Sequence, residues 1–136
     1  MFIKIDPVNG LPIYLQIMNQ VKTAIALGRL QPEEALPSVR QLAMNLAVNP
    51  NTVARAYLDL EHEGVIYKRA GQGTFVSGQG VEMSKRERMK LFNEFLEKSL
   101  VEGIHLGLDP AEMKSSFDQQ LERIILSRQG QKDRGR

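Results

Sequence analysis

The feature that most constrains the fold is the segment 36–76, where two helix-start signals are followed by a glycine-tipped, β-prone hairpin. Ser38 and Gln41 have the spacing of a capping box, in which the serine hydroxyl caps the first turn and the glutamine reaches back. The first helix is therefore predicted to begin at Val39. Its apolar residues recur at helical spacing until the run is interrupted at residues 47–50.

The second start signal is Asn49 followed by Pro50. Asparagine is a good N-cap, and proline suits the first helical position because the amide hydrogen that it lacks would be unpaired there. The second helix is predicted to run from about Pro50 to Glu63, with Gly64 ending it. Because the break between the helices is so short, they are expected to form the angled pair of a helix-turn-helix.

The second helix separates its side chains by face. An apolar stripe predicted to pack inward comprises Val53, Ala56, Tyr57 and Leu60. The opposite, mostly polar face carries Asn51, Arg55, Leu58 and His62, flanked by Thr52 and Asp59. Polar faces are ordinary on surface helices, so polarity alone is weak support for DNA reading. Asn51, Thr52 and Arg55 lie in the first two turns, which a recognition helix directs at base edges in the major groove.

The residues after Gly64 predict a β-hairpin, with β-prone stretches at 65–69 and 74–76 around a turn at 70–73. A hairpin that only closes the core would explain its apolar residues but not Lys68 and Arg69 beside the tip. A basic hairpin directly after a recognition helix is typical of a wing, whose glycines let the backbone approach a minor groove. The glycines do not predict a nucleotide site, because no strand-turn-helix context follows them.

Three motifs, LPSVRQLA, NPNTVARAYLDLE and EGVIYKRAGQGTFV, resemble in order and spacing the DNA-binding domain of the GntR family of bacterial transcription regulators. The phrase IDPVNGLPIYLQI is similar to the opening of the YtrA-type subfamily. The resemblance implies a winged helix-turn-helix domain over residues 10–78. It also implies operator contacts by Arg40, by Asn51 and Thr52, and by Gly71. The arginine that many members carry two positions after the threonine is displaced here to Arg55.

The candidate DNA-binding residues come from the two helix starts and the wing. They are Ser38, Arg40, Asn49, Asn51, Thr52, Arg55, Lys68, Arg69, Gly71, Gln72 and Gly73. The expected partner is double-stranded operator DNA, palindromic if the protein is a two-fold dimer.

A further helix is predicted ahead of these two, from Pro12 to near Gly28, because apolar residues recur there at helical spacing. Residues 1–7 carry Phe2, Ile3 and Ile5, which could form a short extra strand or pack beside this helix.

After a short joint at residues 78–80, the pattern becomes purely helical. Ser84 with Glu87, and Asp109-Pro110 with Glu112, start two amphipathic helices within residues 81–128. Their apolar faces could pack back on the first domain or pair with a second chain, and we expect pairing, which would place two recognition helices ~34 Å apart. The candidate dimerisation residues are Phe92, Phe95, Leu96, Leu100, Phe117, Leu121 and Ile124. The predicted fold class is thus mainly α with a small β-hairpin wing, followed by a two-helix dimerisation hairpin.

Composition narrows the function classes. The chain of 136 residues has no cysteine, which excludes disulfides and thiolate metal sites. No apolar run approaches a membrane span and no signal peptide is apparent, so a cytoplasmic location is expected. The net charge of +2 comes from the last ten residues, and residues 129–136 are expected to form a disordered basic tail. Overall charge therefore adds little to the prediction of DNA binding.

Neither an enzyme nor a cofactor is predicted. His62 and His105 are far apart in sequence and lie in no metal-spaced cluster, while Ser38 is explained by capping. Two helices after the wing are too little chain to enclose a ligand cavity of the usual ~300 Å³ or more, so a small-molecule effector is not expected, and the only place left for one is a dimer interface.

The leading hypothesis is a sequence-specific, dimeric repressor that occludes a promoter. By resemblance to the YtrA type, its target would be a transporter operon. The alternative is a winged helix used as a protein-interaction module, with Leu58 and the C-terminal helices as its contact surface.

Overall fold

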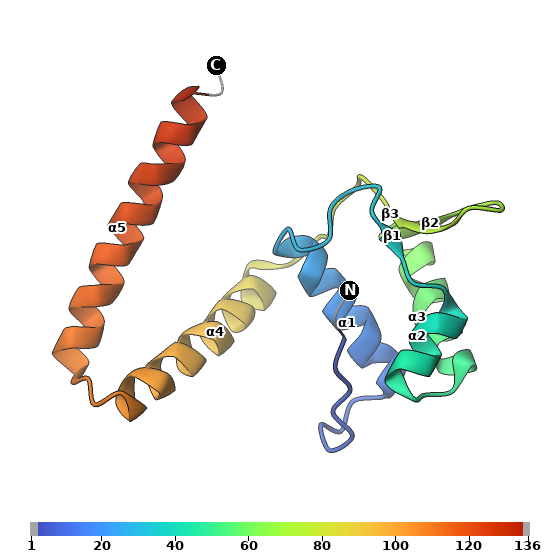
Figure 1. The fold of residues 1–136 in the computed structure, drawn as a ribbon, viewed down its shortest axis with the longest axis horizontal. Helices are drawn as coiled ribbons and strands as arrows, with labels where there is room; N and C mark the ends of the chain where they lie inside the picture. Colours follow the sequence, from blue (N-terminus) through green and yellow to red (C-terminus); the bar gives the residue numbers. More distant parts are fainter. Residues whose placement is uncertain (1–2, 135–136) are drawn as a thin grey trace. The chain divides into compact units, whose positions relative to one another are not determined.

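The computed structural model describes residues 3–134 and divides the chain into two compact units, the first reaching to Glu82 and the second beginning at Met83. The first unit holds three helices and three short strands (Figure 1). They are α1 (Ile13–Ala26), β1 (Ala35–Leu36), α2 (Val39–Leu46), α3 (Pro50–His62), β2 (Ile66–Arg69) and β3 (Gly73–Val76). The second unit consists of α4 (Lys85–His105) and α5 (Pro110–Arg134).

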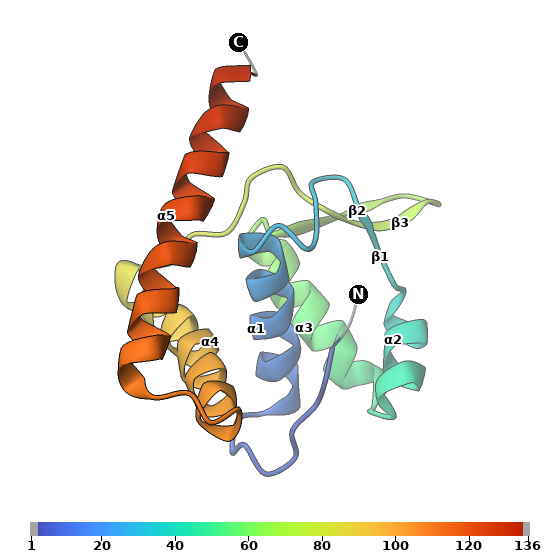
Figure 2. The same cartoon turned by 60° about the vertical axis from the view of Figure 1, so that its left-hand side comes forward.

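Helix α3 is the centre of the first unit, because it packs against α1, α2 and β2. Figure 2 shows α1 and α3 side by side, with the sheet across one end of the helices. The largest fully buried side chains are Tyr57, Ile17, Leu60, Ile66, Val21, Val53 and Val76. The predicted inward stripe of α3, Val53, Ala56, Tyr57 and Leu60, is therefore confirmed, and it packs into the apolar core shared by the three helices and the sheet.

The sheet has one strand more than the predicted hairpin. Its order is β1-β3-β2 and both pairings are antiparallel. Ala35 pairs with Phe75 and Leu36 with Thr74. A strand of two residues is too short to show the alternation of apolar and polar residues by which strands are found in a sequence.

The N-terminal segment packs beside α1, and residues 3–7 form no strand. Gln16 of α1 accepts from the amide of Asp6 at 2.8 Å and donates to its carbonyl at 2.9 Å. Gln20 forms the same reciprocal pair with Lys4. Ile3 is only 9% exposed, so the core extends ahead of residue 10, where the domain was predicted to begin. Phe2 lies outside the described residues.

The second unit begins with a capped helix. The hydroxyl of Ser84 accepts from the amide of Glu87. Asp109 and Glu112 form the reciprocal capping box that starts α5. Helix α5 continues to Arg134, so the prediction of a disordered tail from 129 is wrong for residues 129–134. The segment contains no proline, and cations near a helix C-terminus are favourable there. Residues 135 and 136 lie outside the described residues.

The two helices of this unit diverge from their connecting turn (Figure 1). Within residues 3–134, no helix combines the length and the apolar character that crossing a membrane requires.

Candidate nucleic-acid interface

The helix-turn-helix is built by the two predicted caps. The hydroxyl of Ser38 accepts from the amide of Gln41 at 3.1 Å, and the Gln41 side chain accepts from the amide of Ser38 at 3.2 Å. The side-chain oxygen of Asn49 accepts from the amide of Asn51 at 2.8 Å. Between them Ala47 ends α2 in the left-handed conformation, with φ +55°. The sequence did not indicate this turn residue, because alanine is unusual there.

A part-buried hydrogen bond joins α3 to the loop before α2. The hydroxyl of Tyr57, on α3, donates to the carbonyl of Pro37 at 2.6 Å, immediately before the cap of α2. Tyr57 is 1% exposed, and burial raises the pKa of its phenol. The apolar stripe of α3 thus also fixes where the loop before α2 lies, a link that residue spacing cannot reveal.

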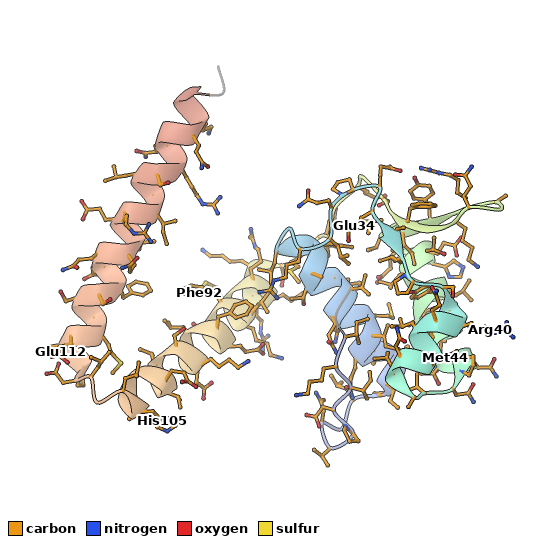
Figure 3. The ribbon with its side chains drawn as sticks, viewed as in Figure 1. Glu34, Arg40, Met44, Phe92, His105 and Glu112 are labelled. Atoms are coloured by element: carbon orange, nitrogen blue, oxygen red, sulfur yellow. The ribbon has the colours of Figure 1, made fainter. Side chains whose placement is uncertain are left out.

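The start of this pair of helices presents an open polar surface. Ser38, Arg40, Asn49 and Asn51 are exposed and Thr52 is half-buried. The caps engage one oxygen each of Ser38 and Asn49, which leaves the hydroxyl hydrogen and the amide nitrogen able to donate. Figure 3 shows Arg40 projecting outward from α2. Within the described residues no carboxylate pairs with its guanidinium.

Arg55 has a partner that the sequence did not indicate. Its guanidinium lies over the ring of Tyr14, with 3.7 Å between the Arg55 Cζ and the ring centroid. This cation–π contact links the exposed face of α3 to α1. Arg55 therefore differs from Arg40, because part of its charge is already engaged within the protein.

The wing is a hairpin whose tip is exposed from Lys68 to Gly73. Gly71 and Gly73 have φ values of +73° and +120°, which side-chain-bearing residues rarely adopt. The amide of Gln72 donates to the carbonyl of Arg69 at 2.9 Å and closes the turn. The backbone at the tip thus requires glycine, as the pattern predicted.

Both wing cations lie near carboxylates. Arg69 forms an ion pair of 2.8 Å with Glu33, and Lys68 lies 3.9 Å from Glu61. The Arg69 guanidinium also lies over the ring of Phe75, 4.4 Å from its centroid. The sequence does not indicate Glu33 as a wing partner, because Glu33 precedes the wing by more than thirty residues and no local pattern joins the two.

The second unit carries a separate feature, an apolar groove of about 680 Å³ between α4 and α5. All seven candidate dimerisation residues line it: Phe92, Phe95, Leu96, Leu100, Phe117, Leu121 and Ile124. Near the turn Gly103 is buried, and a Cβ there would come within 2.5 Å of the Met113 sulfur. A side chain at position 103 would therefore have to displace the Met113 side chain where the two helices meet.

The histidines occupy no comparable cluster. His62 and His105 are exposed, and the described part of the chain contains no group of three or more potential metal ligands among its acidic residues, histidines and cysteines.

Comparison with known proteins places these features in one family. The sequence pattern of the bacterial regulatory proteins of the gntR family matches residues 13–76. The HTH-type transcriptional repressor YtrA of Bacillus subtilis is 37% identical over 107 residues, which cover 79% of this chain and 82% of that protein.

Solved structures agree. YtrA of Sulfolobus acidocaldarius, a GntR-family transcription factor, is 35% identical with a TM-score of 0.54, over 74% of this chain and 99% of its own. A transcriptional antiterminator of Listeria monocytogenes is 32% identical with a TM-score of 0.57, over 92% of this chain and 93% of its own. These relatives are transcription proteins rather than enzymes. With its capped helix-turn-helix and glycine-tipped wing, the chain belongs to the gntR family of bacterial regulatory proteins and is a DNA-binding transcriptional regulator.

Proposed function

We propose that the protein is a dimeric repressor that binds a palindromic operator and occludes the promoter beneath it. One observation carries the DNA-binding part of the proposal: Arg40 is exposed and without an ion pair in the described residues, on a helix-turn-helix whose two helix starts are capped. The name of the similar B. subtilis repressor supports repression. The protein would act in the cytoplasm, on operator DNA that controls a transporter operon.

The proposed contacts divide by chemistry. Arg40 and the wing fix the protein on phosphates and the minor groove, which positions it without reading sequence. Asn51 and Thr52 read base edges in the major groove, where an asparagine can bind adenine through two hydrogen bonds. Arg55, whose guanidinium is stacked on the Tyr14 ring, adds a contact to a base or a phosphate.

The homodimer is proposed from the groove between α4 and α5. Its walls expose large apolar side chains, among them Phe92, Phe117 and Ile124, each more than two-fifths exposed. Soluble proteins rarely leave a large apolar patch exposed, and such a patch usually marks a site where a partner binds. A second copy would supply matching helices and bring two recognition helices to the same face of DNA, one turn apart.

Titration of the purified protein against the DNA upstream of its own gene, and against a scrambled duplex of equal length and at equal salt, tests the proposal. We expect the upstream duplex to bind at least a thousandfold more tightly than the scrambled one, on the order of a specific regulator. Equal, weak binding to both duplexes would instead favour the protein-interaction module. Leu58, which is 50% exposed on α3, would then be part of the surface that contacts a protein partner.

A further inference from the structure

Glu33 has a backbone conformation that seldom suits a residue with a side chain. Its φ is +69°, in the left-handed region. It follows Pro32 in a turn that is closed by a hydrogen bond of 3.1 Å from the Glu34 amide to the Gln31 carbonyl. Positive φ directly after proline in a turn is the position that normally selects glycine. A glutamate at such a position points to a role for its side chain.

That side chain contacts the wing. Its carboxylate accepts from the Arg69 guanidinium at 2.8 Å and also from the Tyr67 hydroxyl. The Glu33 amide donates to the carbonyl of Val76 at 2.8 Å, so both strands of the wing are tied to this residue. The same guanidinium lies over the Phe75 ring. Arg69 is therefore held in one orientation by a carboxylate and an aromatic ring.

The ion pair is open to solvent. The side chain of Glu33 is 58% exposed and that of Arg69 is 44% exposed. Exposed ion pairs are weak, so a DNA phosphate that reaches the wing can compete for the guanidinium. Any such phosphate also approaches the negative charge of Glu33, which opposes it.

We propose that Glu33 is an internal counter-charge that orients Arg69 on the wing and competes with DNA phosphates for its guanidinium, so that it weakens sequence-independent DNA binding. This inference rests on the proposed function, because the competition requires a duplex at the wing. It makes Glu33 a positioning residue that limits affinity, whereas Arg40 remains uncompensated.

The experiment compares wild type, Glu33→Gln and Glu34→Gln in binding to the scrambled duplex across a range of salt. Glu34 is the matched control, because it is exposed, carries the same charge and lies one residue away on the loop into β1 (Figure 3). We expect Glu33→Gln to bind about two- to fivefold more tightly, the range of an exposed ion pair. Its plot of log affinity against log salt should be steeper by up to about 0.9, one extra phosphate contact. Glu34→Gln should change both quantities less.

A double-mutant cycle isolates the pair. In an Arg69→Gln background, Glu33→Gln should raise affinity no more than Glu34→Gln does in wild type, because the cation for which the carboxylate competes is gone and only the general effect of removing a negative charge is left. Glu33→Gly removes the carboxylate and relieves the positive φ at once, so it serves if glutamine does not fold there, with the same gain in affinity expected.

A second measurement needs no DNA. The hydrogen bond to Glu33 raises the pKa of the Tyr67 phenol, which Arg69 opposes. In an absorbance titration, Glu33→Gln should lower the pH at which this phenol ionises, and an unchanged titration would overturn the contact. Unchanged DNA affinity in Glu33→Gln, or an equal gain in Glu34→Gln, would overturn the competition while operator preference by wild type preserves the proposed function. If wild type binds no duplex at all, the proposed function and this inference fail together.

Discussion

At the scale of single residues, the cations of the first unit differ in how much of their charge is available to DNA. Arg69 pairs with Glu33 and Arg55 stacks on Tyr14, whereas Arg40 is exposed without an ion pair in the described residues. A cation that has no internal partner gives up no contact within the protein when it binds a phosphate. We therefore expect Arg40 to contribute more to operator affinity than either of the others.

Arg40→Ala should weaken operator binding by about 1–3 kcal/mol, or roughly five- to 150-fold, with unchanged unfolding. Fluorescence anisotropy with labelled operator measures the loss of affinity. Arg86→Ala is the matched control, because it removes the same charge from the exposed start of α4. Operator affinity that is equal in wild type and Arg40→Ala would refute the role assigned to Arg40.

Tyr57 gives a prediction in pH. Burial raises the pKa of its phenol above the ordinary value of 10.0, so the unfolded chain ionises first. The stability that this provides is complete below pH 10 and is lost as pH rises toward the folded-state pKa. Between pH 10 and 12, wild type should lose up to about 1.4 kcal/mol of unfolding free energy per pH unit more than Tyr57→Phe does.

Urea denaturation at each pH measures the difference. At neutral pH the phenylalanine variant should be about 1–2 kcal/mol less stable than wild type, because the Pro37 carbonyl loses its donor. Parallel stability profiles above pH 10 would contradict the buried, neutral phenol.

The residue-level predictions succeeded where the chemistry is local. Ser38 with Gln41, and Asn49, act within one helical turn, so their spacing alone indicates the hydrogen bonds that the structure shows. The pairs of Arg69 with Glu33 and of Arg55 with Tyr14 join distant segments, and only the packed fold brings those side chains together. The DNA contacts themselves stay predictions.

At the scale of elements, capped helices could be predicted and uncapped extended segments could not. The starts of α2 and α3 match the predicted positions, whereas β1 was missed. The N-terminal segment is held by glutamine side chains that replace the partner strand considered from the sequence. A helix that bonds to an extended segment through its side chains leaves no periodic signal in that segment.

Gln16 carries a prediction for this contact. It is 5% exposed and bonds to the amide and carbonyl of Asp6 and to the carbonyl of Leu11. Gln16→Ala should lower the free energy of unfolding by about 1–3 kcal/mol, because these backbone groups lose their partner. Hydrogen exchange at the Asp6 amide should accelerate accordingly.

Gln20→Ala is the control, since the equivalent bonds to Lys4 are exposed and water can replace them. Gln20→Ala should lower the free energy of unfolding by less than about 1 kcal/mol. Equal losses in the two variants would show that burial does not distinguish the two glutamines.

At the scale of the whole molecule, glycines at residues 78–80 separate two kinds of periodicity in the sequence, and the two compact units of the structure divide between Glu82 and Met83. The length of the second unit could not be predicted, since α5 continues through a charged stretch expected to be disordered. Apolar residues in α4 and α5 indicated faces that need a partner, and the structure leaves them open along a groove. Which partner covers the groove depends on a second molecule, which one sequence does not specify.

Phe117→Glu tests whether that partner is a second copy. In a two-fold dimer each substitution occurs twice, so two apolar side chains worth about 1.5–3 kcal/mol each are lost and two charges are buried. Sedimentation velocity at micromolar concentration should show wild type as a dimer and the variant as a monomer. Leu126→Glu is the control, because Leu126 is 59% exposed on α5 and does not line the groove.

Loss of the dimer should also weaken binding to palindromic DNA. A dimer engages both half-sites of a palindrome at a high effective concentration, whereas a monomer binds them independently. Phe117→Glu should therefore lose at least tenfold in affinity for the full palindrome and little for an isolated half-site, because the recognition surface belongs to the other unit. If the variant remains dimeric, the groove is not the dimer contact. If it becomes monomeric yet binds the palindrome like wild type, each chain acts alone on DNA.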